Sequence, residues 1–255
     1  MAEEKTFSAE IYKDNKHEDW LILIHGFGGS AKTWNKQIGT FSRHYNLLVL
    51  EMHKNTSQEL LNLDMICEHI HNTMLFYGVK KAHFISFSFS SLISLRFAVL
   101  YPNVVNSLIM GGGVIRYSLK TKLLIFLAMN LKKKVNYMLL YRFFAYIIMP
   151  KKNHRRSRDI FVNEARKLGH DEFCKWLNII PQTMNGLEWL KSLQNDISIL
   201  FISGSKDYLF LNDILKYSKK FSNSYVEIIT DCGHVCSIEQ YEKFNNIVIN
   251  HLSRV

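Results

Sequence analysis

The sequence predicts an α/β protein with a mostly parallel sheet, helices on both faces and an inserted helical segment. Short apolar runs alternate with longer segments in which apolar residues recur at helical spacing. Several of the short runs are apolar almost without interruption, which is typical of parallel strands covered on both faces. Repeated alternation of this kind indicates βαβ units arranged in three layers. With 255 residues, 47% of them hydrophobic, the chain can bury one large core.

The apolar runs give the strands in chain order. An N-terminal strand over residues 6–12 is expected to add an antiparallel edge. Six further strands are predicted at residues 20–27, 46–52, 82–87, 104–112, 197–205 and 224–230. Helical spacing predicts helices over residues 58–77, 90–101, 212–221 and 239–252. The second helix is expected to stop before Pro102, because the residue before a proline is biased away from the helical conformation.

The alternation of strands and helices breaks once, between Val114 and about Leu193. This stretch keeps helical spacing, and it is basic and rich in aromatic residues. We therefore predict an α/β core formed by residues 1–113 and 194–255, with residues 114–193 inserted as a helical cap above the sheet.

The most apolar part of the predicted cap is residues 135–149. This run is too short for a membrane span, and Arg142 interrupts it. Its aromatic side chains, among them Phe143, Phe144 and Tyr146, are interpreted first as core packing.

The net charge of +10 is concentrated in one segment. Residues 114–158 contain twelve Lys and Arg and no Asp or Glu, whereas the rest of the chain has 20 basic and 22 acidic residues. Two interpretations stay open: attraction of the cap to an anionic membrane surface, or a solvated face that keeps an apolar cap in solution. Nucleic-acid binding is not favoured, because no helix-turn-helix, zinc-finger or RNA-binding signature accompanies the charge.

Four motifs follow predicted strands, where open α/β sheets build their sites. "HGFGGS" (residues 25–30) follows the first buried strand, and its glycines allow a sharp turn that aims N–H groups at a developing oxyanion. "FISFSFSS" (residues 84–91) spans the end of the strand at 82–87. "GSKD" ends in Asp207, and "CGH" ends in His234. Serine, aspartate and histidine thus come in that order.

This pattern resembles the α/β-hydrolase superfamily over nearly the whole chain, with the helical insertion in the place of the family's cap. The family's strand-to-helix elbow is usually Gly-x-Ser-x-Gly, and its alignment on "FISFSFSS" puts Ser86 and Ser90 at the glycine positions. The resemblance implies that Ser88 is the nucleophile, Asp207 the acid and His234 the general base. It also implies an oxyanion hole formed by the backbone N–H groups of Phe27 and Phe89.

The sequence departs from the family pattern at two places. Neither elbow glycine is present, and "EMHKNTSQ" (residues 51–58) lacks the Asp-x-x-Gly-x-Gly turn common in the family. Glu51 and His53 stand there instead, and no catalytic role is assigned to them. Other interpretations remain open for the three candidates: Ser88 as a serine that caps the next helix, Asp207 as a turn aspartate and His234 as an ordinary partly buried histidine.

The leading hypothesis is a serine hydrolase that cleaves a carboxylic ester or thioester, with a hydrophobic acyl group, through an acyl-enzyme. The alternative is a catalytically weak, hydrolase-like protein that binds a ligand or regulates. No cofactor is expected. A metal site at "CGHVC" (residues 232–236) is not favoured, since no second ligand cluster accompanies it. Four cysteines without a C-x-x-C pair and a start without an apolar secretory region favour a cytoplasmic protein, and peripheral membrane contact through the basic cap stays one of the two open interpretations.

Overall fold

The computed structural model describes residues 6–53, 61–193 and 197–255, and its centre is a seven-stranded sheet. The strand order is β1-β3-β2-β4-β5-β6-β7, in which β1 pairs antiparallel with β3 and all other neighbours are parallel. The strands are β1 (Ser8–Tyr12), β2 (Trp20–Ile24), β3 (Asn46–Glu51), β4 (Ala82–Phe87), β5 (Val105–Gly111), β6 (Ser198–Gly204) and β7 (Ser224–Ile229). The predicted fold class and the antiparallel edge are confirmed.

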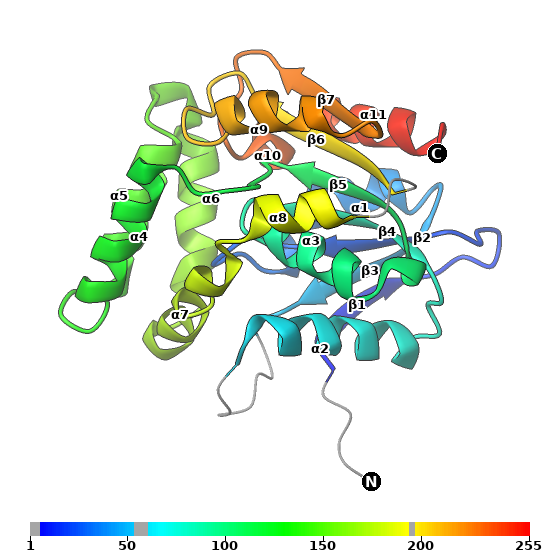
Figure 1. The fold of residues 1–255 in the computed structure, drawn as a ribbon, viewed down its shortest axis with the longest axis horizontal. Coiled ribbons are helices and arrows are strands. Elements are labelled where there is room, and N and C mark those ends of the chain that lie inside the picture. Colours follow the sequence, from blue (N-terminus) through cyan, green and yellow to red (C-terminus); the bar gives the residue numbers. More distant parts are fainter. Residues whose placement is uncertain (1–5, 54–60, 194–196) are drawn as a thin grey trace, which may run out of the picture.

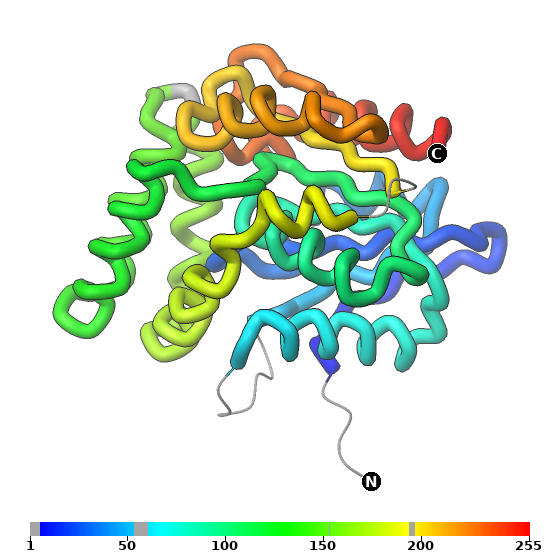
Figure 2. Tube along the Cα trace, viewed as in Figure 1, coloured from blue at the N-terminus to red at the C-terminus, as the bar shows by residue number. Residues whose placement is uncertain are grey.

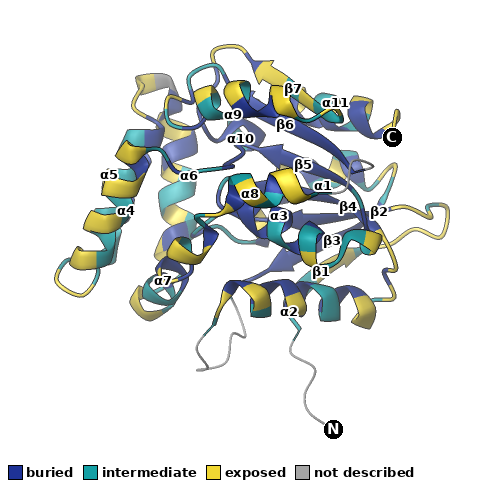
Figure 3. Cartoon of the chain, in the orientation of Figure 1, coloured by how far each residue is buried: buried dark blue, intermediate teal, exposed yellow. Residues whose placement is uncertain are grey.

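The burial of the strands explains their composition. Every residue of β2, β3, β4 and β6 is buried, as the uninterrupted apolar runs predicted. The edge strands β1 and β7 expose part of their residues, and both carry polar side chains among the apolar ones. Figure 3 shows the same gradient from the dark central strands outward.

Helices cover both faces of the sheet. Helices α3 and α8 lie over the near face in Figure 1, whereas α1 and α11 pack together on the far face. The helices outside residues 114–193 are α1 (Asn35–Phe41), α2 (Leu63–Phe76), α3 (Ser90–Leu100), α9 (Leu211–Tyr217), α10 (Cys236–Glu239) and α11 (Tyr241–Leu252), with short 3₁₀ turns η1 (Ala31–Trp34), η2 (Pro102–Val104) and η5 (Ser218–Lys220).

Three of the predicted helices differ from the structure at their ends. The helix predicted over 212–221 corresponds to α9 followed by the 3₁₀ turn η5. The helix predicted over 58–77 begins at Leu63, where the Asn62 side chain accepts a hydrogen bond from the N–H of Met65. Residues 58–60 of that prediction lie outside the described part of the chain. The helix predicted over 239–252 corresponds to the end of α10 and to α11, which are separated at Gln240.

The segment between β5 and β6 is helical, as predicted. It contains α4 (Leu119–Leu131), α5 (Tyr137–Ile148), η3 (Lys152–His154), α6 (Arg155–Arg166), α7 (His170–Leu177), η4 (Ile180–Thr183) and α8 (Gly186–Ser192). Helices α4 to α7 stand beside the sheet, and the chain then returns over it as α8 (Figure 2). A Cβ at Gly186 would lie 2.2 Å from Leu92 of α3, so the approach of α8 to α3 requires glycine there. The boundaries of residues 114–193 as a separate cap remain a prediction.

One interpretation of the aromatic residues in α5 is wrong. Phe143 and Tyr146 are exposed by 60% and 58%, whereas the buried residues of this helix are Tyr141, Ala145 and Ile148. A helix turns about 100° per residue, so positions 143 and 146 point away from the face that holds 141, 145 and 148. Only Phe144 packs partly against the core.

No helix in the described ranges is both long and apolar enough to cross a membrane.

Candidate active site

The carboxyl end of β4 turns into α3 at Ser88. This residue has φ of 54°, and among the described residues only Asp231 shares a positive φ without being glycine. A left-handed conformation disfavours residues with a Cβ, so the turn holds Ser88 in strain. The Ser88 N–H donates to the carbonyl of Gly111 on β5 at 2.9 Å, which fixes the turn against the neighbouring strand.

The serines at the two glycine positions of the elbow point into protein rather than into a cavity. Ser86 and Ser90 are both fully buried. The Ser90 hydroxyl accepts from the N–H of Phe87 at 2.8 Å and lies 2.9 Å from the carbonyl of Ile24, to which it donates. Ser90 therefore joins the elbow to the end of β2, a contact that glycine could not make.

Ser88, His234 and Asp207 form one hydrogen-bonded chain. His234 Nε2 lies 2.8 Å from Ser88 Oγ, and His234 Nδ1 lies 2.7 Å from Asp207 Oδ2. The carboxylate accepts the Nδ1–H, so Nε2 is left as the acceptor for the serine hydroxyl. The imidazole is fully buried between the rings of Phe87 and Phe210, whose centroids are 5.6 and 5.2 Å away. The structure thus brings together the three residues that the sequence singled out.

The loop that carries His234 is held by α10. The Gly233 N–H donates to Glu239 Oε2 at 3.0 Å, and His154 of η3 lies 3.6 Å from the other carboxylate oxygen.

The neighbouring Cys236 is buried, and its thiol points to the carbonyl of Ile202 at 3.7 Å. Burial raises the pKa of this thiol to about 12, so it is protonated at neutral pH.

The glycine-rich loop after β2 faces the same site. Neither the N–H of Phe27 nor that of Phe89 donates a hydrogen bond to another described residue, so both amides are available as donors. Gly28 has φ of +71°, and a Cβ there would lie 2.6 Å from the hydroxyl oxygen of Tyr141. Glycine at this position is therefore required both by the backbone and by the packing of the cap.

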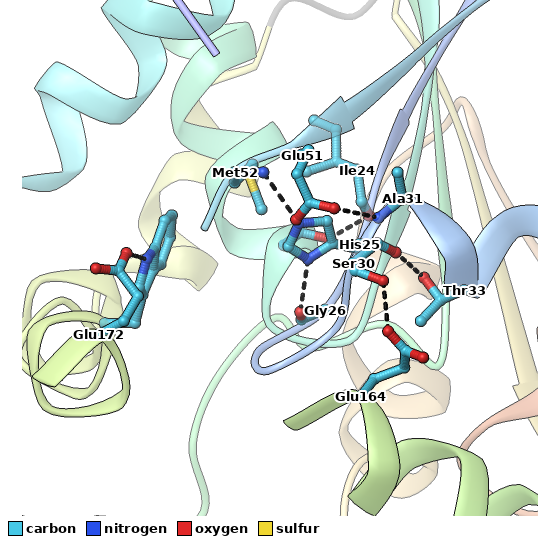
Figure 4. Close-up of polar contacts among 12 residues, drawn as sticks. Ile24, His25, Gly26, Ser30, Ala31, Thr33, Glu51, Met52, Glu164 and Glu172 are labelled. Carbon is cyan, nitrogen blue, oxygen red and sulfur yellow. Dashed lines mark hydrogen bonds and ion pairs between the residues drawn. The ribbon is translucent and has the colours of Figure 1, made fainter. Parts of the chain in front are cut away.

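Two helices of the inserted segment hold this loop. Tyr141 of α5 donates its hydroxyl to the carbonyl of Phe27 at 2.8 Å. Burial raises the pKa of Tyr141 well above its usual value, so the phenol keeps its proton. From α6, Glu164 accepts a hydrogen bond of 2.6 Å from the Ser30 hydroxyl (Figure 4).

His25 and Glu51 support the loop from the core side (Figure 4). The His25 Nδ1–H donates to the carbonyl of Gly26 at 3.0 Å, and Nε2 accepts the N–H of Met52 at 3.1 Å. Burial lowers the pKa of His25, which favours this neutral form. Glu51 accepts the N–H of Ala31 at 3.2 Å. Neither supporting role was predicted from the sequence. The only sign of one was the acid Glu51 at the end of β3, the strand beside β2, which leads into "HGFGGS".

His53 takes no part in the site. Its ring packs 4.6 Å from His25 on one side and 4.6 Å from Trp176 on the other. Burial lowers its pKa well below the usual value, which favours a neutral packing residue.

A cavity of about 470 Å³ lies over Ser88 between the core and the inserted helices. Phe27, Phe89 and Phe210 form its floor around the serine, and α4, α5 and α7 supply its other walls. Among the residues that the structure describes, no charged side chain lines it. Two of its polar groups are paired elsewhere: the Tyr117 hydroxyl with Thr183 at 2.9 Å, and the Tyr141 hydroxyl with the loop.

Comparison with known proteins agrees with this fold. No family model matches the sequence. The chain is 23% identical to a 2-hydroxy-6-oxo-6-(2'-aminophenyl)hexa-2,4-dienoic acid hydrolase of Metapseudomonas resinovorans, across 92% of this chain and 84% of that protein. The solved structure of MGS-M2, an α/β hydrolase from a Medee basin deep-sea metagenome library, superposes with a TM-score of 0.81 at 19% identity, across 98% and 94% of the two chains.

An enol-lactonase from Burkholderia xenovorans LB400 has the same TM-score of 0.81 at 12% identity, across 97% of this chain and 96% of that one. The chain therefore has the α/β-hydrolase fold, and the fold that the resemblance implied is confirmed.

Proposed function

We propose that this protein is a serine hydrolase that cleaves a carboxylic ester or thioester with a hydrophobic acyl group. The observation that carries the proposal is the hydrogen-bonded chain from Ser88 through His234 to Asp207 at the base of an apolar cavity. The left-handed conformation of Ser88 supports it, because strained residues cluster at functional sites.

In the first half of the reaction, His234 Nε2 takes the proton of Ser88 as the serine oxygen attacks the carbonyl carbon. The carbonyl π electrons move to oxygen, and the N–H groups of Phe27 and Phe89 stabilise the resulting charge. Asp207 keeps the proton on Nδ1 and stabilises the imidazolium. When the tetrahedral intermediate collapses, His234 returns a proton to the leaving alcohol or thiol.

In the second half, water replaces the leaving group. His234 takes a proton from water, the hydroxide oxygen attacks the acyl-enzyme, and the same two N–H groups hold the second oxyanion. Collapse of this intermediate releases the acid and returns the proton to Ser88. Each proton taken by His234 is given back, so no redox step or external base is needed.

The cavity favours a neutral acyl group. A carboxylate buried in it would meet no cationic partner in the described part of the chain, and an unpaired buried charge is costly. The relative from Metapseudomonas is named for a dienoic acid, and such an acidic substrate does not suit these walls. The volume of about 470 Å³ suits one apolar chain of moderate length.

The test combines labelling with turnover. We expect a fluorophosphonate probe to label the protein at Ser88, and p-nitrophenyl esters to be hydrolysed faster as the acyl chain lengthens from acetyl to octanoyl. Absence of labelling and of turnover would favour the alternative of a ligand-binding or regulatory protein. Labelling without ester turnover would direct the search to carbon–carbon or lactone substrates.

A further inference from the structure

Helix α4 is mostly apolar, with two lysines, and yet all but one of its residues are at least partly exposed. Of its thirteen residues, only Thr121 is buried. Leu119, Leu123 and Phe126 are exposed by 85%, 59% and 63%. A mostly apolar helix is normally enclosed by protein or lipid, so this one is missing a partner.

Helix α5 also exposes large apolar side chains. Leu139, Phe143 and Tyr146 are exposed by 58%, 60% and 58%. In each helix the three residues stand at positions i, i+4 and i+7, which places them in one stripe. We name these six residues the apolar cap face: Leu119, Leu123, Phe126, Leu139, Phe143 and Tyr146. Figure 3 shows exposed residues along both helices.

Basic residues surround this face. Lys120 and Lys122 on α4, Lys133 and Lys134 in the connection, and Arg142 on α5 are all exposed. No Asp or Glu occurs anywhere in residues 114–158. The cap face therefore combines apolar side chains with one sign of charge, which is the combination that an anionic lipid surface attracts.

We propose that the apolar cap face docks the protein on anionic phospholipid membranes, with α4 and α5 lying in the interface. A second copy of this chain is a poorer occupant, because a face-to-face dimer would bring two acid-free basic segments together. An anionic lipid surface neutralises the same charges while its acyl region receives the apolar side chains.

The docking surface adjoins the cavity over Ser88. Leu127, Leu131 and Phe143 are exposed, and they also line the cavity. Two residues of the apolar cap face, Leu139 and Phe143, are thus part of the cavity wall. The docking itself does not depend on the proposed chemistry.

The experiment measures co-sedimentation with phosphatidylcholine vesicles, with and without phosphatidylserine, at low and physiological salt. We expect clear preference for the anionic vesicles, since each basic side chain near such a surface strengthens partition roughly fivefold. The preference should weaken as salt shortens the Debye length to about 8 Å. Equal binding to both vesicle types, or none at low salt, would overturn the proposal.

A matched pair of variants tests the residues. The triple variant Leu119→Ser, Leu123→Ser, Phe126→Ser should bind at least about tenfold more weakly. It should keep its turnover of a soluble short-chain ester, because none of the three lines the cavity. The control Leu75→Ser, Phe76→Ser removes side chains of similar exposure, 60% and 67%, from α2 and should bind as the parent does.

Two further results separate the possible explanations. Ser88→Ala should bind vesicles as the parent does, so loss of chemistry and loss of docking are distinguishable. If the triple variant bound normally, or if it instead abolished a dimer seen by sedimentation of the lipid-free protein, the face would not be a membrane surface.

Discussion

The hydroxyl of Tyr141, on a helix of the inserted segment, donates to the carbonyl of Phe27 at 2.8 Å across 114 positions of sequence. Phe27 stands in the glycine-rich loop, and it lines the same cavity as Ser88. The hydrogen bond therefore joins the wall of the cavity to the proposed oxyanion hole.

Tyr141→Phe is expected to lower kcat of ester hydrolysis about tenfold, because the glycine-rich loop loses the hydrogen bond from Tyr141. The aromatic ring should keep its place in the cavity wall. Stability should fall by about 1 kcal/mol, as for one neutral hydrogen bond. Tyr117→Phe is the matched control, since its hydroxyl pairs with Thr183 and not with the loop. Equal loss of kcat in both variants would rule out a special role for Tyr141.

Ser88→Ala should reduce ester turnover by roughly 10⁴-fold or more and abolish fluorophosphonate labelling, as removal of a triad nucleophile does. Ser86→Ala should keep most of the activity, because its hydroxyl is buried and lies 3.4 Å from the carbonyl of Ile109. Mass spectrometry of the labelled peptide identifies the modified serine. Retained labelling of Ser88→Ala at Ser90 or Ser91 would show that the wrong serine has been assigned.

The positive φ of Ser88 predicts an order of stability between two inactive variants. Ser88→Gly should be more stable than Ser88→Ala by about 1 kcal/mol, since glycine adopts the left-handed region without the Cβ penalty. Urea denaturation of both variants measures the difference. The reverse order would mean that the turn is not a source of strain.

Asp207→Asn should lower kcat about 10⁴-fold while the protein stays folded, because an amide no longer selects the Nδ1–H tautomer of His234 or stabilises its charge. Combined with Ser88→Ala it should add little, as the residues act as one unit. Asp213→Asn is the control: this carboxylate pairs with Arg116 at 3.5 Å, away from the serine. Full activity of Asp207→Asn would assign the acid elsewhere.

The free energy of unfolding should fall as the pH is lowered below 6.5. Burial lowers the pKa of His25, so at acidic pH the unfolded chain binds a proton that the folded chain does not. Stability then falls by up to about 1.4 kcal/mol per pH unit for this group, between its usual pKa and the lower folded value. Urea denaturation of the parent and of His25→Asn between pH 7 and 5 should give a shallower slope in the variant. Identical slopes would assign the acid sensitivity to other groups.

The sequence predicted the features of the fold and site that depend on local patterns of residues. Mostly apolar runs such as those in residues 20–27 and 46–52 predicted the strands, because parallel strands are buried on both faces. The placement of Ser88, Asp207 and His234 after strands predicted that they would meet, because the ends of parallel strands share one edge.

The supports of the site were not predictable in this way. Tyr141, Glu164 and Glu51 reach the loop through contacts between distant parts of the chain, which leave no period or motif in the sequence. The exposure of Phe143 was also misjudged, since an apolar helix pattern does not tell which of its faces lacks a partner.

The elbow shows what its two flanking positions require. The left-handed backbone falls on Ser88, whereas Ser86 lies within strand β4, which ends at Phe87, and Ser90 begins helix α3. The flanks therefore need small volume and not glycine's conformational freedom, and at Ser90 the extra hydroxyl even gains hydrogen bonds. Pattern searches that demand glycine on both sides of the elbow serine would pass over this chain, and any other chain of this fold that meets the same steric limit with serine.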